Sequence, residues 1–485
     1  MRGAGRTGLA GAAALLGMAA MAPPAAAAEA GGAMTSLAWG LPFAGLLLSI
    51  ALLPLLAPKL WHPHFGKIAF AWTALFLVPY AGVFGLGAAG DELAHVMLGE
   101  YLPFIALLLA LFTTGGGVLL RGHLVGTPVV NTTILAVGTL LASVMGTTGA
   151  SMLLIRPMLR ANAGRRHRMH SFVFFIFLVS NIGGVLTPLG DPPLYLGFLQ
   201  GVSFFWPTQH LFGEFLFCAL LLLGVYFVID SLAYAKEKRA EVEAGAEAAE
   251  HAEHAEAPPG ERLAISGWVN VALLGAVLAV VLMQGLWQPG VISLAGQSIG
   301  VERLVAMLLL LAITFASIHW TPKALRHEND FSWDAMQEVA KLFAGIFLTM
   351  APVLAMLKAG TAGPLGGLVA LTSDAAGRPV PWVYFWLTGA LSSFLDNAPT
   401  YLVFFNLAGG DAARLMAEGA PVLAAISAGA VFMGANSYIG NAPNFMVKAI
   451  VEAQGVRMPS FFGYCGWALV FLVPSFALAT LIFFV

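Results

Sequence analysis

Long apolar stretches, separated by short polar ones, run along almost the whole chain. Many of them reach about 18 residues or more, the length that a helix needs to cross the hydrocarbon core of a bilayer. Such a repeated pattern is typical of membrane-embedded helix bundles. It therefore predicts an all-α polytopic membrane protein.

In the first half, apolar segments predict crossings at about 39–57, 66–86, 101–120 and 213–232. An acidic loop with Asp91, Glu92 and Glu100 is expected between the second and third crossings. The segment 131–157 is interrupted at 146–151, and its leading arm of about 15 residues, roughly 22 Å, is too short to cross. We therefore expect a re-entrant hairpin there.

The segment 171–206 is too long for one crossing and has Gly, Pro and Asp near its middle. Proline breaks helices, and irregular backbone at membrane depth lines a cavity or is buried in protein. Two half-helices joined by unwound backbone are expected. The second half repeats the plan, with crossings at about 267–286, 303–319, 341–360 and 464–485, a hairpin over 380–407 interrupted at 395–400, and a broken helix over 421–454.

An internal repeat relates the two broken helices. Thr187-Pro188-Leu189-Gly190-Asp191 in the first matches Ser437-Tyr438-Ile439-Gly440-Asn441 in the second in kind at Thr/Ser, Leu/Ile, Gly/Gly and Asp/Asn. Each half has five crossings plus one re-entrant hairpin. Because five is odd, the second half must enter the membrane in the opposite sense, which gives two inverted repeats with two broken helices.

Composition divides the chain into four parts. Residues 1–28 have two arginines, a short apolar region and an Ala-rich end, which predicts a signal peptide. The alternative is an uncleaved first helix. Residues 29–232 form the first inverted repeat and 263–485 the second. Residues 233–262, rich in Lys, Glu, Ala and His, are expected to be a solvated cytoplasmic linker.

Only 10% of the residues are charged and the mean hydropathy is +0.84, so a soluble or nucleic-acid-binding protein is excluded. The two cysteines lie in apolar runs and provide no disulfide framework. Lys and Arg gather on the cytoplasmic side if the mature N-terminus and the C-terminus lie outside, which leaves only Arg303, Lys358, Arg378 and Arg414 outside. This pattern predicts a multi-pass protein of a bacterial-type inner membrane.

Polar residues at the hairpin tips and helix breaks are expected to converge near the midplane. Their hydroxyl, amide and carboxylate oxygens are the ligands that a small alkali cation prefers. The alternative roles are capping of half-helices for Asp191 and Asp396 and helix packing for the hydroxyls and amides. Asp230 and Glu214 are interpreted as interfacial, and His170 as a loop residue. The candidate transport residues are Asp191, Asp396, Asn397, Thr400, Asn441, Thr187, Ser437, Asn436, Thr148 and Ser151, beside which Thr147, Asn181 and Asn444 also lie at these points.

These motifs, together with Ser392-Ser-Phe-Leu-Asp-Asn-Ala-Pro-Thr400, resemble those of the ion transporter superfamily. The sequence is most similar to NhaD-type sodium/proton antiporters and to CitMHS-like citrate transporter relatives. The resemblance implies sodium binding at the second tip by Asp396, Asn397 and Thr400, and at the breaks by Asp191 and Asn441. The first tip, Thr147-Thr148-Gly149, lacks the Asn of the family pattern. The resemblance also implies a homodimer with a scaffold domain and a mobile transport domain.

The predicted function is secondary transport: sodium or lithium exchanges for protons at a carboxylate that binds one or the other, with no resident cofactor. Asp191, Asp396 and Asn397 are the expected sodium ligands, and the expected partners are sodium, protons and membrane lipid. The alternative is a sodium- or proton-coupled di- or tricarboxylate symporter, although fixed aspartates repel such an anion. An intramembrane aspartyl protease dyad would need a Gly-x-Gly-Asp motif, and Asp191 follows Pro-Leu-Gly instead.

Overall fold

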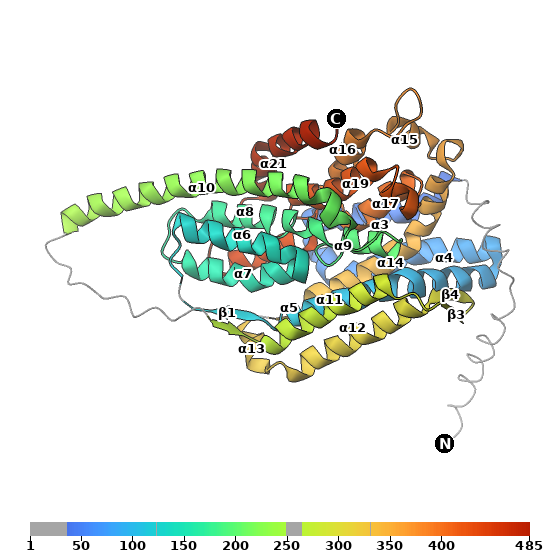
Figure 1. The fold of residues 1–485 in the computed structure, drawn as a ribbon, viewed down its shortest axis with the longest axis horizontal. Coiled ribbons are helices and arrows are strands. Elements are labelled where there is room, and N and C mark those ends of the chain that lie inside the picture. Colours follow the sequence, from blue (N-terminus) through green and yellow to red (C-terminus); the bar gives the residue numbers. More distant parts are fainter. Residues whose placement is uncertain (1–35, 123, 249–263, 330) are drawn as a thin grey trace, which may run out of the picture.

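The computed structural model describes residues 36–122, 124–248, 264–329 and 331–485. The predicted signal peptide, residues 1–28, lies outside them. The described chain is helical almost throughout, and it contains nine helices that are long and apolar enough to cross a membrane (Figure 1). The prediction of an all-α polytopic membrane protein is confirmed.

One group of helices packs around α5 and α14. Within it, α4 packs against α3 and α14, and α5 packs against α11 and α12. The group consists of α3 (Leu41–Leu56), α4 (Pro58–Val96), η3 (Met97–Tyr101), α5 (Leu102–Gly115), α11 (Trp268–Leu286), α12 (Val301–Trp320) and α14 (Asp334–Lys358).

The predicted loop with Asp91, Glu92 and Glu100 is wrong, because the chain is helical from Pro58 to Gly115. The helix kinks at Gly85, where φ is 91°, just before the end of the predicted crossing 66–86. Only glycine adopts such a conformation without steric cost. A single glycine thus changes the direction of the chain without a loop.

The second group contains the interrupted segments. Hairpins are formed by α6 (Pro128–Met145) with α7 (Thr147–Ala161) and by α16 (Pro381–Ser392) with α17 (Asn397–Leu407). The first tip, at Gly146, falls inside the predicted interruption 146–151, and the second, at 393–396, overlaps the predicted interruption 395–400. The broken helices are α8 (Met169–Leu178), η4 (Ile182–Leu186) and α9 (Pro192–Leu199), then α19 (Ala420–Met433), η6 (Gly434–Asn436) and α20 (Ala442–Ala453); α10 (Trp206–Ala248) and α21 (Phe461–Phe483) complete the group.

Helix α10 is longer than the sequence predicts. It runs through Ala248, so the first part of the predicted linker 233–262 is helical and extends away from the bundle (Figure 1). Ala, Glu and Lys, which dominate this part, are among the strongest helix formers. The linker residues 249–262 lie outside the described part of the chain.

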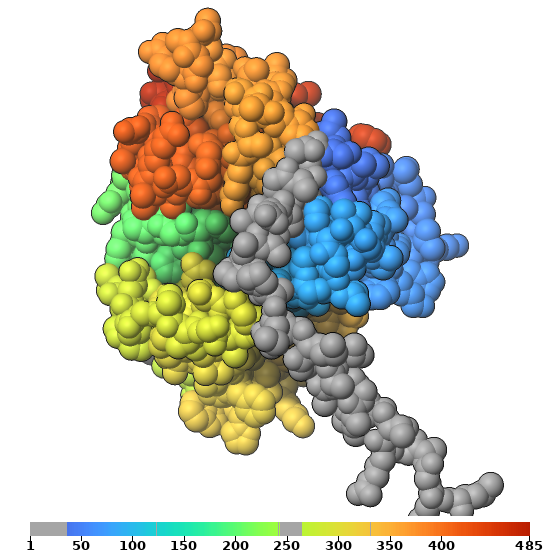
Figure 2. Space-filling model, turned by 90° about the vertical axis from the view of Figure 1, so that its right-hand side faces the viewer, coloured from blue at the N-terminus to red at the C-terminus, as the bar shows by residue number. Residues whose placement is uncertain are grey.

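Short elements connect the helices. Strand β1 (Leu119–Arg121) pairs antiparallel with β2 (Ala264–Ser266), and β3 (Val291–Leu294) pairs with β4 (Gln297–Gly300). Figure 2 views the end of the molecule at which α4, the β3–β4 hairpin and α15 lie.

Arg121 bonds Glu328, and this contact lowers the pKa of the Glu328 carboxyl. The remaining short helices are η2 (Leu37–Gly40), α13 (Lys323–Glu328), η5 (Gly360–Ala362), α15 (Gly366–Leu371) and α18 (Ala412–Met416).

Candidate functional site

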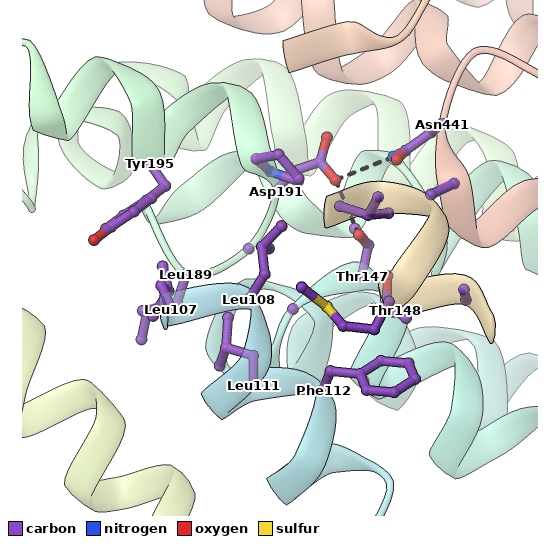
Figure 3. A pocket seen from close by; sticks show the side chains of 18 of the residues that line it. Leu107, Leu108, Leu111, Phe112, Thr147, Thr148, Leu189, Asp191, Tyr195 and Asn441 are labelled. Carbon is purple, nitrogen blue, oxygen red and sulfur yellow. Dashed lines mark hydrogen bonds between the residues drawn. The ribbon is translucent and has the colours of Figure 1, made fainter. Parts of the chain in front are cut away.

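The Asp191 carboxylate lies where both hairpin tips and both helix breaks meet. Asp191 has extended backbone immediately before α9 and is 1% exposed. Its Oδ1 accepts hydrogen bonds from Thr147 Oγ1 at 2.9 Å and from Asn441 Nδ2 at 3.0 Å (Figure 3). Its Oδ2 accepts a hydrogen bond from Asn397 Nδ2. Four segments that are far apart in sequence therefore hold one carboxylate.

Four half-helices begin at this point. The first residue of each half-helix lines one cavity: Thr147 of α7, Pro192 of α9, Asn397 of α17 and Ala442 of α20. Each helix N-terminus carries a partial positive charge from its unpaired N–H groups. The converging N-termini stabilise the buried charge of Asp191.

The same hydrogen-bond pattern holds each break against its hairpin. Thr187 Oγ1 donates to the Ser143 carbonyl, and Ser437 Oγ donates to the Ser393 carbonyl, each over a separation of 44 residues. Corresponding positions in the two halves are 250 residues apart, as are Asp191 and Asn441. Thr187 and Ser437 thus fix the backbone of the breaks, and their hydroxyls do not line the cavity.

Glycine is required where each break folds back on itself. A Cβ atom at Gly190 would overlap the carbonyl of Gly184, and one at Gly440 would overlap that of Gly434. This approach places the residue after each glycine, Asp191 or Asn441, at the cavity. The shared Gly of the sequence motif has a steric reason.

Asp396 has the capping role that was weighed as an alternative. It is the N-cap of α17, and its Oδ1 accepts a hydrogen bond from the Ala398 backbone N–H at 3.1 Å. Thr400 Oγ1 donates to the Asp396 carbonyl at 2.9 Å. Asp396 also lines the cavity that contains Asp191. Capping and a place in the cavity are therefore combined in one side chain.

The cavity has a volume of about 100 Å³. One side is formed by the polar tips and breaks, with Thr148 among them, and the other by apolar side chains of α5 such as Leu108 and Phe112 (Figure 3). Met336 of α14 also lines the cavity. Among the described residues that line it, none is Lys, Arg or His. The charged side chains at this cavity are the two aspartates.

Two buried amide oxygens at the tips and breaks have no hydrogen-bond partner among the described residues. They are Oδ1 of Asn397, which lines the cavity, and Oδ1 of Asn436, whose Nδ2 donates to Ser393 Oγ at 2.9 Å. Buried polar atoms in folded proteins are almost always paired. An unpaired amide oxygen beside a carboxylate fits the ligand preference of an alkali cation.

The other predicted site residues lie around the cavity without lining it. Ser151 Oγ is 2.8 Å from Ser180 Oγ in a buried pair between α7 and the first break. Asn181 Nδ2 donates to Asn444 Oδ1 at 2.7 Å, and Asn441 Nδ2 donates to Asn181 Oδ1 at 3.2 Å. These amides connect the two breaks to each other.

Sequence reasoning missed Ser143 and Ser393 and the apolar wall. The two serines have a sequence signal, since they are separated by the repeat spacing of 250 residues that also relates Asp191 and Asn441. Leucine and phenylalanine on α5 carry no such signal, because the same residue types face lipid elsewhere on the chain.

A second buried polar cluster surrounds Asp230 and corrects one interpretation. Asp230 is fully buried within the protein, and it bonds Arg165 NH1 at 2.7 Å, His170 Nε2 at 2.8 Å and Asn131 Nδ2 at 3.0 Å. His170 lies in α8 and is buried, so it is not a loop residue. The cluster joins α6 and α8 to α10, and burial is possible because Arg165 neutralises the carboxylate.

A protein-family model with the description "Putative citrate transport" matches residues 32–484. The chain belongs to the CitMHS_2 family. No curated protein matches the sequence. The family and the apolar helices together make this CitMHS_2 protein a multi-pass membrane transport protein.

Proposed function

We propose that this protein exchanges sodium or lithium for protons by alternating access. The observation that carries the proposal is the charge of the cavity: it has two carboxylates and, among its described lining residues, no cationic side chain. Carboxylates away from water need a positive partner or a proton. A small cation or a proton at Asp191 meets that need.

The exchange follows from competition at one group. The ionised Asp191 carboxylate, held by Thr147, Asn441 and Asn397, binds either a sodium ion or a proton. The free Oδ1 of Asn397 and the carboxylate of Asp396 are further oxygen ligands for the sodium ion. Because one cation excludes the other, exposure of the site to the two sides in turn couples their movements.

The proposed movement separates the two helix groups. The cavity lies where α5 contacts α7 and where α14 contacts α17, which are contacts between the groups. The group around α5 and α14 would be the scaffold of a homodimer in the inner membrane, with both termini of the mature chain outside. The hairpins and broken helices would move together with the cation.

Coupled uptake of a di- or tricarboxylate is the second candidate. The family description and the four helix N-termini at the cavity favour it, since such N-termini attract anionic groups. One observation opposes it: the described residues that line the cavity include no cationic side chain to pair with the anion.

Reconstituted protein in acid-loaded liposomes tests the proposal. Addition of Na⁺ or Li⁺ should raise the internal pH with no organic anion present. Asp191→Asn and Asp396→Asn should each abolish the response, and Asn at position 396 still caps α17. Asp374→Asn, which changes a half-buried loop aspartate paired with Arg378 outside the cavity, is the matched control. A pH response that requires citrate or succinate, with uptake of the labelled anion, would instead establish the symporter.

A further inference from the structure

The exposed face of α10 changes from apolar to basic within about one helical turn. Val228 and Leu232 are 57% and 67% exposed, as expected for side chains that contact lipid tails. Lys236, Lys238 and Arg239 follow and are also exposed. Leu232 and Lys236 are about 6 Å apart along the helix axis. This change marks the boundary between hydrocarbon and headgroups.

Two arginines from another segment lie at the same level. Arg166 and Arg168 belong to the loop between α7 and α8, and Arg165 in that loop bonds both Asp230 and Glu237 of α10, at 2.7 and 3.0 Å. The Arg168 guanidinium donates to the Asn162 and Ala163 carbonyls. The loop is therefore held beside the basic face of α10.

Arg165 pairs with two acidic side chains of α10 near this level. Asp230 and Glu237 both bond its guanidinium, and Glu237 also accepts a hydrogen bond from the His167 backbone N–H. Five basic side chains remain without an ion pair among the described residues: Arg166, Arg168, Lys236, Lys238 and Arg239. We call them the basic collar. The Tyr234 ring, 5.3 Å from the Lys238 ammonium, adds an aromatic side chain typical of the membrane interface.

We propose that the basic collar binds the phosphate headgroup of an anionic phospholipid. Guanidinium and ammonium groups form charge-assisted hydrogen bonds with phosphate oxygens. Basic clusters directly beside a membrane-spanning helix attract anionic lipid at close range. The collar is also attached to α7 and α8, which carry Thr147 and lead to the break before Asp191. This lipid site is independent of the proposed exchange.

The test uses the purified full chain in a neutral detergent. Phosphatidylglycerol or phosphatidylcholine is added, and retained lipid is measured by native mass spectrometry together with the melting temperature. The protein should retain phosphatidylglycerol selectively. The triple variant Lys236→Gln/Lys238→Gln/Arg239→Gln should weaken this retention on the order of a hundredfold.

The matched control, Lys59→Gln/Lys67→Gln/Lys323→Gln, removes the same charge from exposed lysines of α4 and α13 and should keep the retention. Equal loss in both triple variants, or equal retention of the two lipids, would overturn the proposal. Protection by inorganic phosphate as strong as that by the lipid would show a free-phosphate site instead. If the triple variant does not fold, Arg166→Gln/Arg168→Gln must show the selective loss.

Discussion

Replacing Asn441 with alanine removes one of the three donors that hold the Asp191 carboxylate. The Asn441 amide donates to Oδ1 at 3.0 Å, and both side chains are at most 2% exposed. A hydrogen bond to a charged group contributes about 1.5–3 kcal/mol. One pH unit corresponds to about 1.4 kcal/mol. The pH dependence of exchange is therefore expected to shift by about one to two pH units.

The direction of the shift follows from the charge. Asn441 stabilises the ionised carboxylate, so its loss favours the protonated form of Asp191. The proton is then retained up to a higher pH, and sodium competes for the site only above that pH. The acid limb of the exchange profile should move to higher pH, and the rate should recover in alkaline solution. Thr147 and Asn397 remain as donors, which favours the lower end of the range.

The assay is sodium-driven proton release from reconstituted liposomes, measured with a pH-sensitive dye over a series of pH values. Asn406→Ala is the matched control, because Asn406 is a buried asparagine of α17 whose amide donates to the Leu402 carbonyl and not to Asp191. Its profile should stay in place. A folded Asn441→Ala protein with an unchanged profile, or with one moved to lower pH, would refute the reasoning.

Two further predictions concern packing. Gly190→Ala should lower the free energy of unfolding by about 1–3 kcal/mol and slow exchange, because the added Cβ overlaps the Gly184 carbonyl. Gly224→Ala, with open space around the added Cβ, should change neither stability nor rate. Equal melting temperatures and exchange rates of the two variants would contradict this. Asp230→Ala should lower stability by about 3–5 kcal/mol, since Arg165 and His170 would lose their shared acceptor. Asp230→Asn should lower it less, and an unchanged melting temperature of the alanine variant would show that the cluster is not a stabilising one.

The helix breaks could be predicted because their cause is local. Gly, Pro and a polar side chain inside an apolar run, as at Gly190-Asp191-Pro192, are incompatible with an unbroken helix in lipid, whatever surrounds them. The tips at Gly146 and Asp396 follow from the same argument. The residues that meet at Asp191 could therefore be proposed before their geometry was known.

The remaining features depend on partners that are distant in sequence. The burial of Asp230 near a span end follows only once Arg165 is placed beside it, since an unpaired carboxylate would not be buried. The predicted loop is wrong because Asp91, Glu92 and Glu100 continue the helix, and the chain bends at Gly85 instead. The apolar side chains of α5 can be recognised as part of the cavity only once the tips and breaks are placed opposite them.

The arrangement around Asp191 links cation binding to the position of both halves. Thr147 and Asn397 reach the carboxylate from the two hairpin tips, and Asn441 reaches it from the second break, so displacement of any one element leaves the buried charge with fewer donors. An under-coordinated carboxylate away from water is costly. In the proposed exchange, the hairpins and breaks move together past the apolar wall of α5 and α14, which offers no further donor, so the charge must be neutralised by Na⁺ or H⁺ before they move. That requirement would prevent movement of the empty, ionised site and would thereby make the exchange obligatory.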